Sequence, residues 1–158
     1  MMRQILFAAL ACALAACSPG AGGAAPAAPR TVHPQSGLEV VPLTVTSAAG
    51  VRSFRVEVAR SASEQAKGLM FRTRLGPDEG MIFPMDPPRG ASFWMKNTVI
   101  PLDLIFVAPD GRISNIAANA VPYDLNPLTS IGPVKAVLEI AGGRAAELGI
   151  APGDKVAW

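Results

Sequence analysis

The chain has 158 residues, half of them hydrophobic, and its 14 Lys and Arg against 12 Asp and Glu give a formal net charge of +2 at pH 7. This near balance does not indicate binding to nucleic acid or to a strongly acidic surface. Both cysteines, Cys12 and Cys17, lie near the N-terminus. Disulfides, thiolate nucleophiles and cysteine-based zinc sites are therefore excluded from the rest of the chain.

The first residues predict export. Arg3 supplies a positive charge ahead of an apolar run over 5–16, which is shorter than the roughly 20 residues that cross a bilayer. The run ends in Leu14-Ala15-Ala16-Cys17, which resembles the lipobox of bacterial lipoproteins, in which the cysteine receives lipid. The alternative is an ordinary secretory cleavage in which Cys17 is incidental. We expect a signal peptide over 1–16 and a lipid on Cys17.

Lipidation of Cys17 would hold the protein on the periplasmic face of a membrane, because each buried CH₂ contributes about 0.8 kcal/mol and more than one acyl chain gives stable anchoring. Ser18 follows the cysteine. By resemblance to the sorting rules of lipoproteins, the absence of Asp at this position favours the outer membrane. Loss of Arg3 with the signal peptide would leave 13 Lys and Arg against 12 Asp and Glu.

A flexible tether is expected over 17–36, because Gly, Ala, Pro and Ser dominate there and bury too little surface to offset conformational entropy. His33, the only histidine, lies in this tether, so a catalytic imidazole or a histidine metal site is not expected. The remaining residues, 37–158, are long enough for a single domain with one core.

The domain reads as a series of short strands separated by Gly, Pro and Asp. A capping box, Ser61-Ala62-Ser63-Glu64 followed by Gly68, predicts a helix of about two turns, and a second short helix is expected from Gly143 to Leu148 with Gly149 as its stop. Pro109-Asp110-Gly111 should close a hairpin. The predicted strands are 41–46, 52–59, 81–84, 92–95, 104–107, 113–117, 136–140 and 154–158. The fold class is α+β, mainly β, with a compact curled or barrel-like sheet.

A series of motifs points to one family. The segments are Gly68-Leu69-Met70-Phe71-Arg72, Gly80-Met81-Ile82-Phe83, Phe93-Trp94-Met95-Lys96-Asn97-Thr98, residues 100–106, residues 137–143 and residues 149–156. Together they resemble the domain of unknown function 192 family over nearly all of residues 55–158. The resemblance implies a small, mostly β bacterial domain, often behind an export signal, and no established activity.

The segment from Trp94 to Thr98 predicts a binding groove. An indole stacks on the apolar face of a sugar ring, and neighbouring polar side chains can bind its hydroxyl groups. The candidate ligand-binding residues are Trp94, Asn97, Thr98, Asp103, Arg72, Lys96 and Glu139. The alternative is structural: Trp94 fills the core, Asn97 and Thr98 cap a turn, and Asp103 pairs with Arg72 or Lys96. The leading hypothesis is an accessory module that binds a saccharide or an envelope protein, without a cofactor.

Glu139 lies inside an apolar strand, so its role depends on whether it has a partner. An arginine such as Arg72 would neutralise it, whereas an unpaired buried carboxylate would be a functional signal. A hydrolase acting on an envelope polymer is one alternative function, because Asp103, Glu139 and Asp154 could supply paired carboxylates. The identity of any catalytic residue stays open at this point.

Methionine sulfur supports a third hypothesis. Thioethers bind Cu(I), which a periplasmic protein can meet. Gap filling in a small core is the commoner role of methionine. The residues concerned are Met70, Met81, Met85 and Met95.

Overall fold

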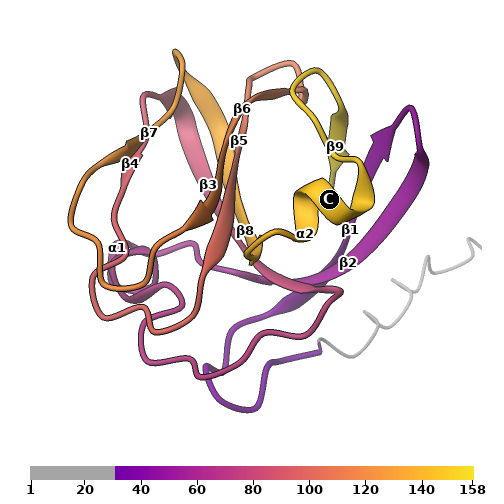
Figure 1. The fold of residues 1–158 in the computed structure, drawn as a ribbon. Helices are drawn as coiled ribbons and strands as arrows, with labels where there is room; N and C mark the ends of the chain where they lie inside the picture. Colours follow the sequence, from indigo (N-terminus) through magenta and orange to yellow (C-terminus); the bar gives the residue numbers. More distant parts are fainter. Residues whose placement is uncertain (1–30) are drawn as a thin grey trace, which may run out of the picture.

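A seven-stranded mixed sheet forms most of the protein (Figure 1). The computed structural model describes residues 31–158, so the predicted signal peptide, Cys17 and most of the predicted tether lie outside the described residues. The strand order is β6-β5-β8-β3-β2-β1-β9. These strands are β1 (Val40–Ser47), β2 (Gly50–Val58), β3 (Glu79–Arg89), β5 (Leu102–Val107), β6 (Ile113–Ala120), β8 (Val134–Ala141) and β9 (Lys155–Ala157).

Neighbouring strands are antiparallel, except that β2 and β3 run parallel. A parallel pair needs a crossover connection, and this one contains helix α1 (Ala62–Lys67). A separate two-stranded sheet is formed by β4 (Ser92–Phe93) and β7 (Leu128–Thr129). Helix α2 (Arg144–Leu148) follows β8. In Figure 1, α1, β4 and β7 lie at one side of the molecule and α2 and β9 at the other.

The predicted class, α+β and mainly β with two short helices, is confirmed. The sheet is curled but is not closed into a barrel. Its edge strands β6 and β9 are not paired with one another along their length. They meet at an isolated bridge between Arg112 and Lys155 and at three backbone hydrogen bonds, which join Gly111 and Ile113 to residues 153–156. The physical reason is the shortness of β9, whose three residues already pair with β1.

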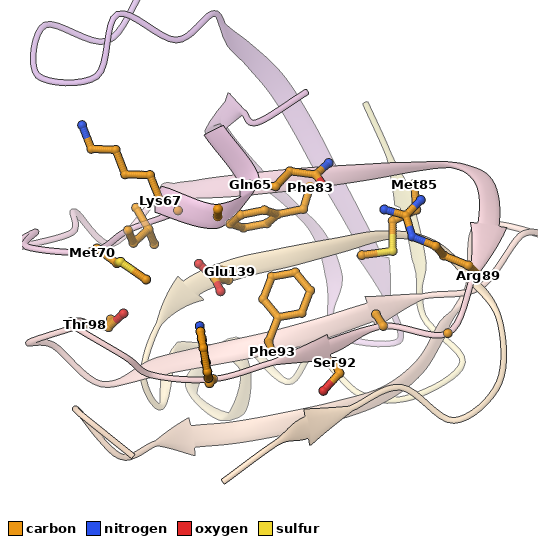
Figure 2. A pocket seen from close by; sticks show the side chains of 16 residues that line it. Gln65, Lys67, Met70, Phe83, Met85, Arg89, Ser92, Phe93, Thr98 and Glu139 are labelled. Carbon is orange, nitrogen blue, oxygen red and sulfur yellow. The ribbon is translucent and has the colours of Figure 1, made fainter. Parts of the chain in front are cut away.

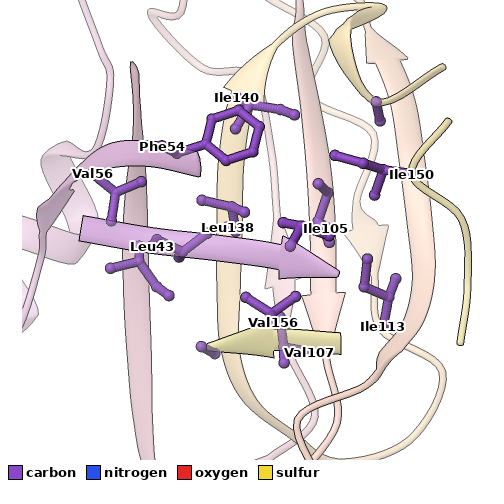
Figure 3. Packing of buried hydrophobic residues seen from close by; sticks show 14 of the residues in the cluster. Leu43, Phe54, Val56, Ile105, Val107, Ile113, Leu138, Ile140, Ile150 and Val156 are labelled. Atoms are coloured by element: carbon purple, nitrogen blue, oxygen red, sulfur yellow. The ribbon is translucent and has the colours of Figure 1, made fainter. Parts of the chain in front are cut away.

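Strand β8 separates two hydrophobic clusters. Its alternate residues Ala136, Leu138 and Ile140 belong to the first cluster, whereas Val137 belongs to the second, as expected from the two-residue period of a strand. The first cluster, shown in Figure 3, also includes side chains of β1, β2, β5, α2 and β9. The second cluster contains Ala59, Leu69, Met81, Phe83, Met85, Ala91, Met95, Leu102, Leu104, Phe106, Ala120, Val134 and Val137.

Local signals that the sequence predicted are confirmed. The amide of Glu64 donates to Ser61 Oγ at 3.3 Å, and Glu64 Oε2 accepts from the Ser61 amide at 2.7 Å, which completes the capping box. Gly68 ends the helix with a positive φ of 47°. In the hairpin turn between β5 and β6, Gly111 has a φ of 88° and Asp110 Oδ1 accepts from the amide of Arg112 at 2.9 Å.

Residues 31–36 differ from the expected flexible tether. Val32 forms a bridge with Glu39, and the amide of His33 donates to the carbonyl of Leu38 at 2.8 Å. The side chains of His33 and Ser36 both contact Glu57 of β2. These contacts are long-range in sequence, so composition alone did not reveal them. Among residues 31–158, no helix is long and apolar enough to cross a membrane.

Gly80 in β3 generates a stability prediction. A Cβ at this position would lie 2.5 Å from the carbonyl oxygen of Glu139, which is backbone and cannot move aside cheaply. We expect Gly80→Ala to lower the free energy of unfolding by about 1–3 kcal/mol, the usual cost of overpacking. Urea denaturation measures this change. Gly90→Ala is the matched control because nothing lies within 4 Å of its Cβ; equal stability of the two variants would contradict the prediction.

Candidate functional site: a cleft above Glu139

An open cleft of about 440 Å³ lies on the side of the sheet that carries the second cluster. Small-molecule sites in proteins typically have volumes of about 300–1,000 Å³. Helix α1 and the turn after it form one wall, β3 and β8 contribute the floor, and β4 with the following loop forms the opposite wall (Figure 2). The lining residues are 65–70, Phe83, Met85, 89–94, Thr98 and Glu139.

Glu139 is placed at the floor by the register of β8. Its backbone lies between Met81 of β3 and Leu104 of β5, so its neighbours across both ladders are apolar. The residue is 5% exposed, and its carboxylate points into the cleft in Figure 2. No described residue forms a hydrogen bond or an ion pair with this carboxylate.

Burial without a partner changes the ionisation of this group. Removing a carboxylate from water disfavours its charged form, and burial raises the pKa of Glu139 to about 8. At neutral pH the side chain is therefore mainly a carboxylic acid, which can donate one hydrogen bond and accept another. Of the two alternatives that the sequence left open for Glu139, neutralisation by an arginine and burial without a partner, the structure shows the second.

Aromatic rings line the cleft from β3 and from the wall opposite α1. Phe83 and Phe93 pack edge to face, with ring centroids 5.1 Å apart and an interplanar angle of 83°. Trp94 is 52% exposed, so the structure does not place it in the core. Lys96 Nζ lies 5.2 Å from the centroid of the Trp94 ring, a cation–π distance. The cleft thus offers apolar ring surface beside a hydrogen-bonding floor.

The loop after Trp94 brings Thr98 into the cleft. Asn97 has a left-handed φ of 55°, and its carbonyl accepts from the amide of Phe71 at 2.8 Å. Thr98 is 5% exposed, lines the cleft, and its Oγ1 donates to the carbonyl of Lys96 at 3.3 Å. Asn97 itself does not line the cleft; its Nδ2 lies 3.8 Å from Met70 Sδ.

Asp103 is not near this cleft. It is fully buried, and its oxygens accept hydrogen bonds from the amides of Asn119 at 2.7 Å, Gly143 at 2.9 Å and Ala145 at 2.7 Å. It faces α2, on the side of the sheet opposite Glu139. The suggested pairing of Asp103 with Arg72 or Lys96 is wrong, because backbone amides occupy its carboxylate.

Arg72 does not neutralise Glu139 either. Its Nη2 donates to both carboxylate oxygens of Glu57, at 2.9 and 2.8 Å, and both side chains are buried. Ser36 Oγ also donates to Glu57, and His33 Nδ1 lies 3.7 Å from it. The sequence could not identify Glu57 as the partner of Arg72, because the pairing depends on which segments lie side by side in the fold.

The structure brings together neither the paired carboxylates of the hydrolase hypothesis nor the methionine sulfurs of the copper hypothesis. Glu139 is the only carboxylate among the described residues that line the cleft. Asp154 accepts instead from the amide of Ala151 at 2.8 Å, so the three candidate carboxylates do not converge. Of the methionines, Met81, Met85 and Met95 are buried, and Met70 and Met85 line opposite ends of the cleft in Figure 2.

The structure brings three of the predicted site residues, Trp94, Thr98 and Glu139, into the lining of one cleft. Several other lining residues were not predicted from the sequence. Gln65 is held at the wall by donating to the carbonyls of Ala59 and Pro84, at 3.1 and 2.9 Å. Lys67 and Arg89 also line the cleft. Lys67 could have been proposed as a site residue from the sequence, because it lies in the last turn of a predicted helix, next to Gly68.

The raised pKa of Glu139 makes stability depend on pH. Between about pH 4.5 and about pH 8 the folded state holds a proton that the unfolded state releases, so the free energy of unfolding falls as pH rises through this window. Glu139→Gln should remove this contribution and be more stable than the wild type at about pH 9. Urea denaturation of both proteins at several pH values measures the difference; parallel pH curves would contradict the assignment.

The Arg72–Glu57 pair gives a second prediction. Arg72→Met leaves a buried carboxylate without its main partner, and we expect it to lower the free energy of unfolding by about 3–5 kcal/mol. Adding Glu57→Gln removes the unpaired charge, so the double variant should recover most of this loss. Thermal or urea unfolding of the two single variants and the double variant tests the coupling; simple additivity would refute it.

Comparisons with known proteins agree with this fold. The chain is similar to a protein of unknown function from Novosphingobium aromaticivorans DSM 12444, with 64% identity and a TM-score of 0.81 over 89% of this chain and 100% of that one. It is also similar to a Sinorhizobium meliloti 1021 protein that is provisionally named a transcription regulator, with 38% identity and a TM-score of 0.74 over 76% of this chain and 94% of that one.

No curated protein matches the chain. The model of the DUF192 family, described as "Uncharacterized ACR", matches residues 43–158. This match begins in β1 and so extends the resemblance of the sequence motifs toward the N-terminus. Because the matched region covers most of the chain, the protein belongs to the DUF192 family.

Proposed function

We propose that this protein is an accessory binding module of the bacterial envelope that holds a saccharide-type ligand in the cleft above Glu139. In this proposal, Cys17 carries the lipid that anchors the module to the periplasmic face of the outer membrane. The ligand would stack on the exposed ring of Trp94 and form hydrogen bonds with Glu139 at the floor.

The main support for this proposal is that the carboxyl group of Glu139 has no partner among the described residues. A buried polar group without a hydrogen bond costs stability, so a protein gains nothing structural from placing it beside Met81 and Leu104. A ligand hydroxyl in the cleft would satisfy both its donor and its acceptor capacity. The group therefore has a function in binding that it does not have in folding.

The surrounding surface supports a ligand with both an apolar and a polar side. Sugar rings present C–H groups on one face and hydroxyls at the edges, which suits an aromatic ring next to hydrogen-bonding groups. Trp94 offers the ring, and Ser92 lines the same cleft with an exposed side chain. A regulator that binds nucleic acid is less favoured, because a net charge of +2 provides little attraction for phosphates.

Tryptophan fluorescence tests this proposal directly. The full-length protein, in a detergent without a sugar headgroup, is titrated with soluble cell-wall and polysaccharide fragments. We expect a saturable change, and we expect Trp94→Ala to weaken binding by at least about tenfold, as loss of a central aromatic contact does. Glu139→Ala should also weaken binding, because it removes the hydrogen bonds at the floor.

Trp158→Ala is the matched control. Trp158 is the second tryptophan, and Lys135 lies 5.0 Å from its ring centroid, much as Lys96 lies over Trp94. It is remote from the cleft lining, so its removal should leave the affinity unchanged. Equal loss in both tryptophan variants, or no response to any fragment, would refute a saccharide site at Trp94.

A further inference from the structure

The two ends of the cleft carry positive charges. Lys67 lies at the end of α1 and Arg89 at the end of β3, and both line the cleft. Figure 2 shows them on opposite sides of Glu139. Neither forms an ion pair with any residue among 31–158. Both side chains are exposed, so they are free to meet a ligand that occupies the cleft.

The floor does not cancel these charges at neutral pH. Burial raises the pKa of Glu139 to about 8, so the carboxyl group is mainly uncharged there. The other charged residues that line the cleft are Arg89 from β3 and Lys67 from α1, whose ammonium group points away from Glu139 in Figure 2, while β5 contributes the apolar Leu104. Lys96, in the loop after β4, lies over Trp94 at the rim. The cleft is therefore cationic at its ends and neutral at its floor.

This distribution of charge favours an anionic ligand over a cationic one. A cationic ligand would have to pass Lys67 and Arg89 and would meet an uncharged carboxyl group at the floor. An anionic ligand is attracted at both ends, and a carboxylic acid can donate a hydrogen bond to it. The planar guanidinium of Arg89 suits a carboxylate especially, because it can donate two parallel hydrogen bonds.

We infer that the cleft binds an acidic saccharide, a sugar chain that carries carboxylate groups, with its ring on Trp94 and its carboxylates directed to Lys67 and Arg89. This inference rests on the proposed saccharide site and names the class of its ligand. The spacing of the two cations at opposite ends favours a chain with more than one acidic sugar over a single small anion.

A matched pair of ligands tests the charge. Short oligogalacturonates and their methyl esters have the same sugar rings and differ in the presence of negative charge. Titration of the full-length protein at about pH 6 should show tighter binding of the acid form, and the difference should shrink as salt screens the charges. Lys67→Gln and Arg89→Gln should each weaken binding of the acid form by about two- to fivefold and leave the ester almost unaffected.

Lys135→Gln is the control for net charge, because it removes one positive charge beside Trp158 and away from the cleft lining. It should leave both affinities unchanged. Raising the pH above about 8 ionises Glu139 and should weaken binding of the acid form. Glu139→Gln keeps a neutral floor, so its affinity for the acid form should not fall over this pH range.

The outcomes separate the two proposals. If the methyl ester binds as tightly as the acid form, with the Trp94→Ala loss intact, the charge inference is overturned and the saccharide site stands. If neither form binds and no other fragment does, the saccharide site itself fails. Equal weakening by Lys67→Gln and Lys135→Gln would also overturn the inference, because the effect would then be one of net charge alone.

Discussion

Residues 136–140 of strand β8 are buried between two apolar clusters, and this constraint governs the rest of the structure. Ala136, Leu138 and Ile140 pack into one cluster and Val137 into the other, so a side chain between residues 136 and 140 must fit an apolar environment. Glu139 is the one ionisable residue between residues 136 and 140, and it is 5% exposed. It can occupy this strand because a cleft opens over it, and its uncharged form avoids most of the cost of a buried charge.

Two other buried carboxylates, unlike Glu139, have partners within the fold. Glu57 has Arg72 against both of its oxygens, and Asp103 has backbone amides, so each is satisfied by the fold itself. Buried polar groups are normally satisfied in this way. The contrast with Glu139 separates structural carboxylates from the candidate functional one more clearly than burial does, since all three are at most 5% exposed.

Local signals made much of the fold predictable, and long-range contacts limited the rest. The capping box of α1 and the turn at Gly111 depend on neighbours in sequence, so they could be inferred. Strand β3 continues past Pro84 to Arg89, although prolines argue against a strand; its pairing with β8 is irregular between these two residues. Two-residue strands such as β7 have no periodicity to detect. The site was predictable as far as Trp94, Thr98 and Glu139, whereas the partner of Arg72 required knowledge of which strands are adjacent.

The carboxylate of Asp103 joins three segments that are otherwise loops or loop edges. Its bonds reach the amides of Asn119 near the end of β6, Gly143 before α2, and Ala145 in its first turn. These amides point at a buried oxygen and not at solvent, so they should exchange their hydrogens slowly despite their irregular surroundings. The three segments would then open together, as one cooperative unit. The α2 side of the sheet could unfold in this way while the Glu139 cleft stays folded.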